Sequence, residues 1–369
     1  MTTPEQGGAG DRRIRVLHVI FLVGETNSQY NEHCLPLVGR RDLSICAYAE
    51  PSVEPPKAIT VFAGDGTLRG FFRATRSALD ASEYDVIHVH APPTAVLLLL
   101  AIAAHPRRRK LLRSLVYTVH DSFYDYKVRD RLLMLPIFAV SRRTVFCGQA
   151  AQESYPAPWR AIARGRGRVV PNAADLERVR RAIADVSVRD GAFGIVSVGR
   201  LEQVKDPMTL LEAFRSADDG ASRLEIVGVG RLEARLRREI HASRLEDRVE
   251  LTGLIPRDEV FVRCANADLF VSPSRGEGLP VGVIEAMASG CPVVLSDIPP
   301  HREVAEGADF IPLVPVGDAA LFAREIGRFQ RMRSEERRVI GSKCRELALA
   351  RFGLERMHAG YDAVYRELL

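Results

Sequence analysis

The stretch RGEGLPVGVIEAMASG, residues 275–290, places two glutamates eight positions apart on either side of a Gly-Leu-Pro turn. Gly278 and Pro280 interrupt any continuous helix and predict that a new helix starts near Pro280. Glu277 then lies in the loop, and Glu285 lies about one turn inside the helix. Unpaired backbone N–H groups and the positive end of the helix dipole favour an anionic or hydroxyl-rich ligand at such a helix start. A phosphorylated sugar has both properties.

The length and composition of the chain predict its domain organisation and its class. A length of 369 residues exceeds what one hydrophobic core usually organises, and 46% apolar with 27% charged residues is ordinary for globular domains, so we expect two domains. The N-terminal stretch MTTPEQGGAGDRRIR is polar, so we expect a frayed tail, no secretion signal and a cytoplasmic protein. The six cysteines form no C-x-x-C pattern and are expected to be buried thiols.

Charge is unevenly distributed along the chain. Residues 1–170 carry 23 Lys and Arg against 15 Asp and Glu, whereas residues 171–369 carry 29 against 32, so an anionic partner would meet the first half. The apolar stretch over residues 91–104 is too short to span a bilayer and predicts a buried crossover helix. The basic run over residues 107–110 either is a solvated helix end or binds anionic lipid head groups.

Short β-rich apolar runs alternate with helix-length segments in both halves. In the first half the runs are RVLHVIFLV, DLSICAY, AITVF, DVIHVH, LVYTVH and TVFCG, with helices expected over residues 68–82 and 94–104. In the second half they are GIVSVGR, SRLEIVG, RVELTG, ADLFVSPS, CPVVLS and ADFIPL. This alternation predicts two doubly wound α/β domains with parallel sheets, joined between residues 171 and 191. Ligands of such sheets bind beyond the carboxyl ends of the strands.

Basic residues follow the first predicted strand of the second half. Gly199 and Arg200 follow the strand GIVSV, and Lys205 comes five residues after Arg200. A glycine lets the backbone approach a ligand, and arginine with lysine offers a forked donor and a compact charge for a diphosphate. The alternative interpretation is that Arg200 and Lys205 are solvated surface cations. The glutamate pair, Glu277 and Glu285, favours the diphosphate site. The G-x-G at Gly228 lacks a third glycine and an acidic partner, so it predicts a tight turn rather than a dinucleotide site.

Two further strand ends stand out in the first half. Gly24 follows the first strand, and His120 with Asp121 follows the strand VYTV. A lone histidine is more often structural than catalytic, but the position of His120 just after a strand raises it above His88 and His90. These two histidines alternate with valine and can be explained as sheet residues.

On these residues the chain resembles the family 4 glycosyltransferases, retaining enzymes with the GT-B fold of two Rossmann-like domains facing a central cleft. The resembling segments are, in order, VGRLEQVKDPMTLLEAF, the G-x-G, ELTGLIPRDEV, ADLFVSPSRGEGLPVGVIEAMASGCPVV and RFGLERMHAGYDAVYRELL. The resemblance implies an acceptor-binding domain over residues 1–172 and a nucleotide-sugar donor domain over residues 173–353. It also implies a closing helix, about residues 354–369, that crosses back to the first domain.

The resemblance also assigns roles to residues. Arg200 and Lys205 would hold the donor diphosphate, Glu277 would face the donor sugar, Glu285 would accept hydrogen bonds from the ribose, and His120 would lie near the reacting sugar. The catalytic set it implies is His120, Arg200, Lys205 and Glu277. The other donor-binding residues it implies are Gly24, Gly199, Gly228, Leu254, Gly278, Leu279, Pro280 and Val281. Two positions depart from the family pattern. A single Gly24 stands where many members have two glycines, and Asp206 replaces a glycine often found after the lysine.

The implied reaction is retaining transfer of a hexose-type sugar from a nucleoside-diphosphate sugar to a glycan, lipid-linked or small-molecule acceptor. Neither a cofactor nor a metal is expected, because two cations can replace the metal and the chain has no Asp-x-Asp triplet. The alternatives are a catalytically silent nucleotide-sugar-binding subunit and a sugar-nucleotide 2-epimerase on the same fold. The expected partners are the donor and an acceptor, which the basic first half favours as anionic or lipid-linked. No nucleic-acid partner is expected, and peripheral contact of the basic domain with the cytoplasmic membrane face is a further hypothesis.

Overall fold

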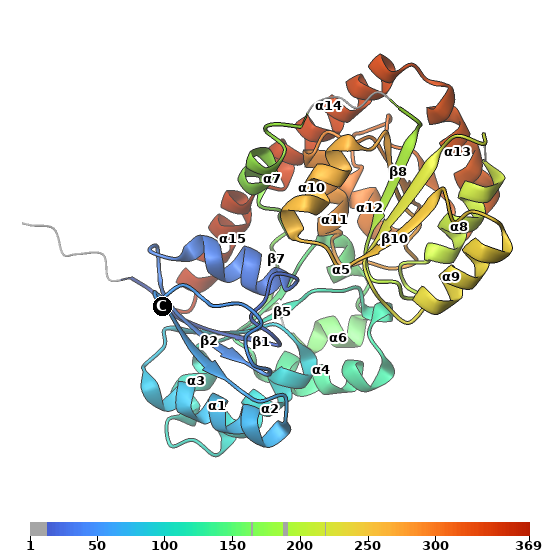
Figure 1. Cartoon of the computed structure of the whole chain (residues 1–369). Helices are drawn as coiled ribbons and strands as arrows, with labels where there is room; N and C mark the ends of the chain where they lie inside the picture. The colour runs from blue at the N-terminus through green and yellow to red at the C-terminus, as the bar shows by residue number, and fades with distance from the viewer. Residues whose placement is uncertain (1–12, 164, 187–190, 218) are drawn as a thin grey trace, which may run out of the picture. The chain divides into compact units, whose positions relative to one another are not determined.

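The computed structural model describes residues 13–163, 165–186, 191–217 and 219–369 (Figure 1). The chain divides into two compact units. Unit 1 runs to Tyr117 and adds Val140–Arg142 and Tyr365–Leu369, and unit 2 contains Thr118–Ala139 and Arg143–Val364. The expected polar tail over residues 1–12 and part of the expected junction, residues 187–190, lie outside the described residues.

The first sheet is parallel, with the strand order β3-β2-β1-β4-β5-β6-β7. Its strands are β1 (Arg15–Ile20), β2 (Asp42–Ala47), β3 (Ile59–Ala63), β4 (Val86–Val89), β5 (Leu115–Val119), β6 (Arg143–Phe146) and β7 (Gly167–Val169). The first six coincide with the apolar runs read from the sequence. Strand β7 was not anticipated, because its three residues are only partly buried and show no apolar run. The order reverses between β1 and β4, which makes this pair the switch point of the first sheet.

The helices of unit 1 follow the predicted segments. They are α1 (Leu68–Ala81), α2 (Pro92–Ala103) and α3 (Arg108–Arg113), and in Figure 1 they lie together beside the strands of this unit. Helix α1 begins where the Thr67 side chain accepts a hydrogen bond from the Gly70 N–H. Helix α2 buries Leu98 and Ile102, as expected of a crossover helix. Between β1 and β2 the chain forms a π-helical turn, Gln29–Cys34, and a short 3₁₀ turn, Leu35–Leu37.

The second sheet lies wholly in unit 2 and is also parallel, with the order β10-β9-β8-β11-β12-β13. Its strands are β8 (Gly194–Val198), β9 (Arg223–Val227), β10 (Val249–Gly253), β11 (Leu269–Ser272), β12 (Val293–Ser296) and β13 (Leu313–Val314). All six occur in the second predicted series, although β13 covers only the end of its run. Its switch point lies between β8 and β11.

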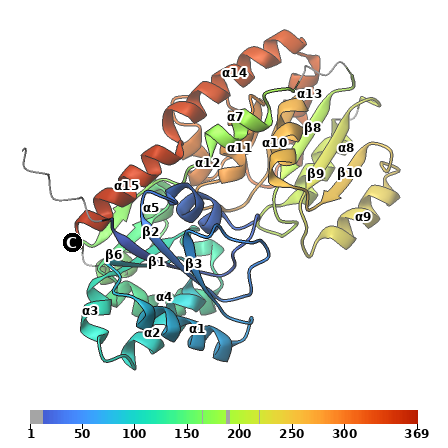
Figure 2. The ribbon, with the colours of Figure 1, turned by 60° about the vertical axis from the view of Figure 1, so that its left-hand side comes forward.

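Helices cover both faces of the second sheet. One layer contains α8 (Pro207–Ser216), α9 (Glu233–Ala242) and α13 (Ala319–Arg331), and its core includes Phe214 and Phe322. The other contains α7 (Leu176–Ala182), α10 (Arg257–Asn266) and α11 (Val281–Ala288), and its core includes Phe261 and Ile284. Figure 2 shows α8 and α10 on opposite sides of the strands. The remaining elements are η3 (Phe123–Asp125), α4 (Val128–Val140), α5 (Gln149–Glu153), α6 (Ala157–Ile162), α12 (Pro299–Val304), α14 (Ser334–Arg351) and α15 (Leu354–Arg366).

The closing helix exists as predicted, and its last turn belongs to unit 1. There the Tyr365 hydroxyl lies 2.6 Å from Nδ1 of His88 on β4. The compact units divide the chain inside β5, whereas the two sheets divide it between β7 and β8, so the domain limits at residues 172 and 353 stay a prediction. All six cysteines are buried and free, as expected. Within the described ranges, no helix combines the length and the apolar character that a bilayer crossing requires.

Candidate functional site

The predicted residues of unit 2 gather where β8 and β11 end. These strands are neighbours at the switch point of the second sheet, and ligands of open α/β sheets bind beyond the strand ends at such a point. Strand β8 continues into Gly199, Arg200 and Lys205, and β11 continues into the loop that carries Glu277. The topology therefore brings together two segments that are about seventy residues apart in the sequence.

The loop after β11 turns into α11 as the sequence predicted. Helix α11 spans Val281–Ala288 with Pro280 as its N-cap, which leaves Glu277 in the loop and Glu285 in the helix. Both carboxylate residues are buried, with 9% and 7% of their surface exposed. The Leu279 side chain packs into the core beside α11 and anchors the loop. Burial at these two positions requires a cation or hydrogen-bond donors for each carboxylate.

Lys205 is the cation for Glu277. Its Nζ lies 2.5 and 2.6 Å from the two carboxylate oxygens. The Glu277 side chain is 10% exposed and the Lys205 side chain 25%. Burial alone raises the pKa of the Glu277 carboxyl, but the Lys205 ammonium, with smaller effects from His301 and Ser274, outweighs burial and brings that pKa below its usual value. Glu277 therefore stays ionised, and the loops after β8 and β11 carry a matched pair of charges.

Asp206 and Arg275 fasten these two loops to each other. The Arg275 N–H donates to the Val204 carbonyl at 2.7 Å, and the Arg275 guanidinium lies 2.6 Å from a carboxylate oxygen of Asp206. Asp206 has a left-handed backbone with φ of 48°, a region that favours glycine. Its carboxylate offsets that strain by capping α8 through Thr209. Aspartate at position 206, where the family often has glycine, thus caps α8 and forms an ion pair with Arg275 next to Lys205 in the sequence.

Glu285 has a different partner. Its carboxylate pairs with the guanidinium of Arg257, the first residue of α10. The sequence reasoning did not single out Arg257, although a buried glutamate and a nearby Ile-Pro-Arg helix start together could have suggested it. Leu254, expected near the nucleotide base, lies in the loop between β10 and α10 and is 65% exposed. Arg257 thus contacts Glu285 through its side chain, and in the sequence it directly follows the loop that carries Leu254.

The G-x-G does not itself form the predicted tight turn: Gly228 forms a β-bridge with Gly253, and the turn begins at Gly230, whose carbonyl accepts a hydrogen bond from the Glu233 N–H at 3.2 Å. Gly228 has φ of 135°, and a Cβ there would collide with the carbonyl oxygen of Gly199. The Gly199 N–H donates to Val227 at 3.0 Å, and the Gly228 N–H donates to Gly253 at 2.9 Å. Glycine at position 228 therefore lets the ends of β8, β9 and β10 lie close together, and Arg200 emerges from this junction exposed to solvent.

The segment after β5 packs against the Glu277 loop within unit 2. The Ser122 hydroxyl donates to the Glu277 carbonyl at 2.6 Å. A Cβ on Gly278 would collide with the carbonyl oxygen of His120, so only glycine permits this approach. Residues His120 and Glu277, predicted from distant motifs, are thereby brought to one place. Ser122 had no sequence signal, because short polar residues are common in loops.

The electrostatics of this segment follow from burial beside charges. Burial lowers the pKa of His120 to about 4, which keeps the imidazole neutral near pH 7. The pKa of Asp121 is raised, first by burial and then by the negative charge of Glu277, while Lys205 and Arg200 act in the opposite direction. Lys205 and this segment both contact Glu277, Lys205 at the carboxylate and Ser122 at the backbone carbonyl.

Gly24 belongs to unit 1, after β1. Its carbonyl accepts a hydrogen bond from the Asn27 N–H at 3.1 Å. The buried Asn31 side chain donates to the carbonyls of Gly24, Glu25 and Asn27 at 2.7 to 3.2 Å. This single-glycine loop is thus closed by a side-chain amide from the π-helical turn that follows it.

Two profiles of protein families match the chain. The profile described as Glycosyltransferase Family 4 matches residues 42–178, and the one described as Glycosyl transferases group 1 matches residues 180–346. WcaL of Escherichia coli (strain K12), named for colanic acid biosynthesis, is 37% identical over 160 residues, which are 41% of this chain and 39% of WcaL. The chain thus matches about two fifths of this relative's length.

Solved structures agree with the fold. Sucrose-phosphate synthase of Thermosynechococcus elongatus has a TM-score of 0.79 at 19% identity, and the match covers 96% of this chain and 99% of that one. HepE of Anabaena, solved with UDP and glucose, has a TM-score of 0.72 at 19% identity, with 95% and 99% covered.

Two parallel Rossmann-like sheets, with charged loops at the switch point of the second, define a protein of the GT-B class. Because the two matching profiles together extend from residue 42 to residue 346, the chain is a member of the family 4 glycosyltransferases.

Proposed function

We propose that this protein is a retaining glycosyltransferase that moves a hexose-type sugar from a nucleoside-diphosphate sugar to an acceptor hydroxyl without a catalytic metal. The observation that carries the proposal is the buried Lys205–Glu277 ion pair at the β8/β11 switch point. An ammonium has three N–H donors, so Lys205 is able to contact a phosphate oxygen while it keeps Glu277. Arg200, exposed beside it, supplies a forked donor to the same diphosphate.

The two glutamates suit the two sugars of such a donor. Glu277, ionised by its neighbour, accepts hydrogen bonds from hydroxyls of the transferred sugar. Glu285 pairs with Arg257, and a carboxylate has enough lone pairs to receive ribose hydroxyls as well. His120, neutral near pH 7, contacts the reacting sugar without adding positive charge where positive charge develops.

The reaction balances without a separate nucleophile. The bond between the anomeric carbon and the phosphate oxygen breaks, and the bond from that carbon to the acceptor oxygen forms on the same face. The proton of the acceptor hydroxyl passes to the departing phosphate oxygen, and the products are the glycoside and the nucleoside diphosphate. Arg200 and Lys205 stabilise the negative charge that grows on the phosphate, the role a metal has in other transferases.

A thermal-shift panel of UDP, GDP, ADP and dTDP tests the donor site. Each nucleotide is measured with and without EDTA, on the wild type and on Glu285→Ala. We expect one nucleotide, with UDP the first candidate because HepE was solved with it, to raise Tm by several degrees. The rise should be indifferent to EDTA and lost in the variant. A chain that no nucleotide stabilises would instead fit a silent or differently liganded relative.

We propose an anionic acceptor, presented at a membrane surface. Helix α3 and its flank carry four exposed cations in unit 1, namely Arg108, Arg109, Lys110 and Arg113. Each Lys or Arg near an anionic bilayer contributes roughly 1 kcal/mol of binding. The double variant Arg108→Glu/Arg109→Glu should therefore lose binding to phosphatidylglycerol vesicles about tenfold or more, while its nucleotide-induced Tm shift stays. Equal binding to phosphatidylcholine vesicles, unaffected by salt, would contradict this proposal.

A further inference from the structure

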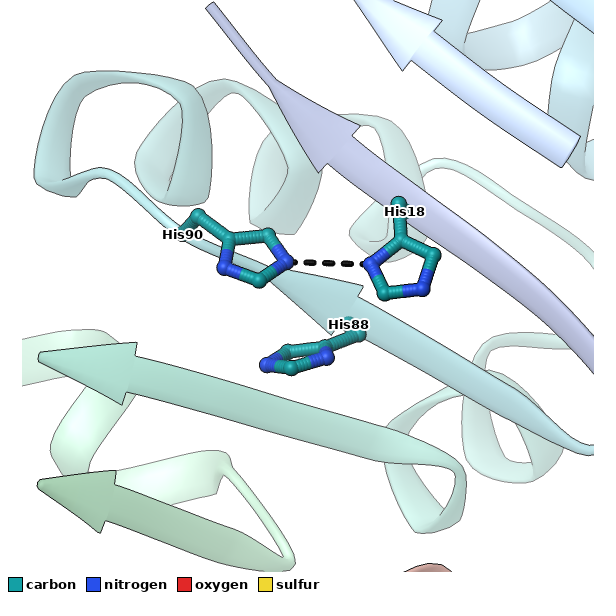
Figure 3. A group of neighbouring side chains, drawn as sticks. All are labelled: His18, His88 and His90. Atoms are coloured by element: carbon teal, nitrogen blue, oxygen red, sulfur yellow. Dashed lines mark hydrogen bonds between the residues drawn. The ribbon is translucent and has the colours of Figure 1, made fainter. Parts of the chain in front are cut away.

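Three histidines of unit 1 gather on one face of the first sheet (Figure 3). His18 lies on β1 and His88 on β4, and their Cα atoms are paired in register, so their side chains point to the same face. His90 comes directly after β4, two positions beyond His88, and therefore keeps that face. Their exposed fractions are 1%, 0% and 4%. Two of them, His88 and His90, were explained from the sequence as ordinary sheet positions.

The ring nitrogens of these residues converge. Nδ1 of His18 lies 3.0 Å from Nε2 of His90, as the dashed line in Figure 3 marks. One ligand nitrogen from each of the three rings lies within 4.8 Å of those of the other two. Two imidazole nitrogens bound to one tetrahedral Zn²⁺ are about 3.3 Å apart, given bonds of about 2.0 to 2.1 Å. To bind one ion, the ring nitrogens of His18 and His90 would have to move slightly apart. The ring nitrogen of His88 would have to move closer to both.

His88 is oriented by a hydrogen bond from the other side of its ring. Its Nδ1 lies 2.6 Å from the hydroxyl of Tyr365, which is 1% exposed. The guanidinium of Arg41 lies 4.8 Å from the centre of the Tyr365 ring and packs on it. When Nδ1–H donates to the phenol oxygen, Nε2 is the nitrogen whose lone pair is available to a metal ion. Metal-bound histidines commonly have this kind of second partner, which fixes their tautomer and orientation.

We propose that His18, His88 and His90 bind one Zn²⁺ ion at the switch point of the first sheet. Three imidazoles are a donor set that late first-row divalent cations favour, and Zn²⁺ with three protein ligands completes its tetrahedron with water. The crossovers diverge at the β1/β4 switch point, where an open α/β sheet accepts a ligand. The ion ties β1 to β4 and stabilises unit 1. All three ligands and Tyr365 belong to unit 1, and the proposal does not rest on nucleotide binding.

The surroundings suit a cation. The π-helical turn Gln29–Cys34 contributes His33, whose ring centre lies 5.0 Å from that of His90. The adjacent Glu32 is 2% exposed and brings a carboxylate into the same turn. The alternative is a set of histidines that hydrogen bonds hold in place, among them those of His18 with His90 and of His88 with Tyr365. The two readings differ in one measurable property, since only the first takes up metal.

Metal uptake by the full chain tests the proposal. The protein is freed of any affinity tag, treated with EDTA, desalted and titrated with Zn²⁺ by calorimetry. A second titration with Co²⁺ follows the ligand-field absorption of a tetrahedral site. We expect one equivalent of either ion per chain and a higher Tm with Zn²⁺ in the absence of nucleotide. A wild-type chain that takes up no ion would overturn the proposal.

Matched variants locate the ion. His88→Gln/His90→Gln should abolish uptake, whereas His105→Gln should leave it unchanged, because His105 is a buried histidine of the same unit paired with Asp80. Tyr365→Phe retains all three ligands and should weaken Zn²⁺ affinity about 10- to 100-fold. Uptake that survives in the double variant would also overturn the proposal. If the double variant does not fold, the Tyr365→Phe titration decides, since affinity equal to wild type contradicts the assigned geometry.

Discussion

The two sheets have the same order around their switch points, yet the side chains there differ in kind. At β8/β11 the loops carry Arg200, Lys205 and Glu277, so the site is built from full charges. At β1/β4 the strands and their ends carry His18, His88 and His90, so the proposed site is built from imidazole nitrogens. On the two proposals, topology sets where each ligand binds and residue type sets which ligand it is.

The contrast also extends to how each region is held. In unit 2 the two charged loops are fastened to each other by Arg275 and Asp206, outside the regular strands. In unit 1 the histidines lie on or beside paired strands, and their positions follow from strand register. Loop residues are able to move toward a ligand that arrives and leaves, whereas strand residues offer a fixed geometry that suits a resident ion.

The largest expected effect tests the charged switch point. Arg200→Ala should lower turnover about 100- to 1000-fold, because the guanidinium stabilises charge that develops only on the departing phosphate. Donor hydrolysis or transfer is measured with the nucleotide sugar that the thermal-shift panel identifies. Arg237→Ala serves as a control, since Arg237 is an exposed partner of Glu233 on α9. Turnover of Arg200→Ala near that of the wild type would remove Arg200 from the catalytic set.

The next effect separates stability from catalysis. Lys205→Met leaves the buried Glu277 carboxylate without its cation and should destabilise unit 2 by about 3 kcal/mol. Lys205→Met/Glu277→Gln removes both charges and should recover most of that loss, measured as Tm. Neither variant should bind the nucleoside diphosphate as the wild type does. Full recovery of nucleotide binding in the double variant would show that the pair is structural and not a donor site.

A smaller effect tests the close approach of the Glu277 loop to the segment that carries His120. Gly278→Ala introduces a Cβ against the His120 carbonyl and should cost about 1 to 3 kcal/mol and reduce turnover. Gly282→Ala is the matched control four positions later, where the nearest atom to an added Cβ is the Val198 carbonyl oxygen at 3.8 Å. Thermal unfolding of the two variants gives the comparison. Equal Tm values for both would contradict the packing of His120 on this loop.

The smallest effect concerns pH. Burial lowers the pKa of His301 from 6.5 to about 4, so between these values the unfolded chain binds a proton that the folded chain excludes. Stability contributed by this group is therefore full above about pH 6.5 and falls as pH drops toward 4. In EDTA, which excludes the zinc site, His301→Gln should flatten part of the decrease in Tm. A wild type and variant with parallel pH profiles would contradict the lowered pKa.

Much of the donor region was readable from the sequence because its signals are local. Gly278 and Pro280 correctly placed Glu277 in a loop and Glu285 in a helix. The tight turn expected at Gly228 was wrong, because this residue forms a β-bridge with Gly253 on a neighbouring strand. Arg257 and Arg275 were not recognised as partners of Glu285 and Asp206. Ion pairs between residues 28 and 69 positions apart have no sequence period, so only the packing of the segments shows them.

The sequence by itself determined two parallel α/β sheets and the strand ends that carry charge, because hydrophobic runs and turn residues act over a few neighbours. The tertiary structure decided what those residues face. His88 and His90 looked like ordinary strand residues until β1 placed His18 beside them and α15 placed Tyr365 behind them. Such neighbours are set by strand register and by a helix 277 residues away, and these are properties of the folded chain rather than of any segment.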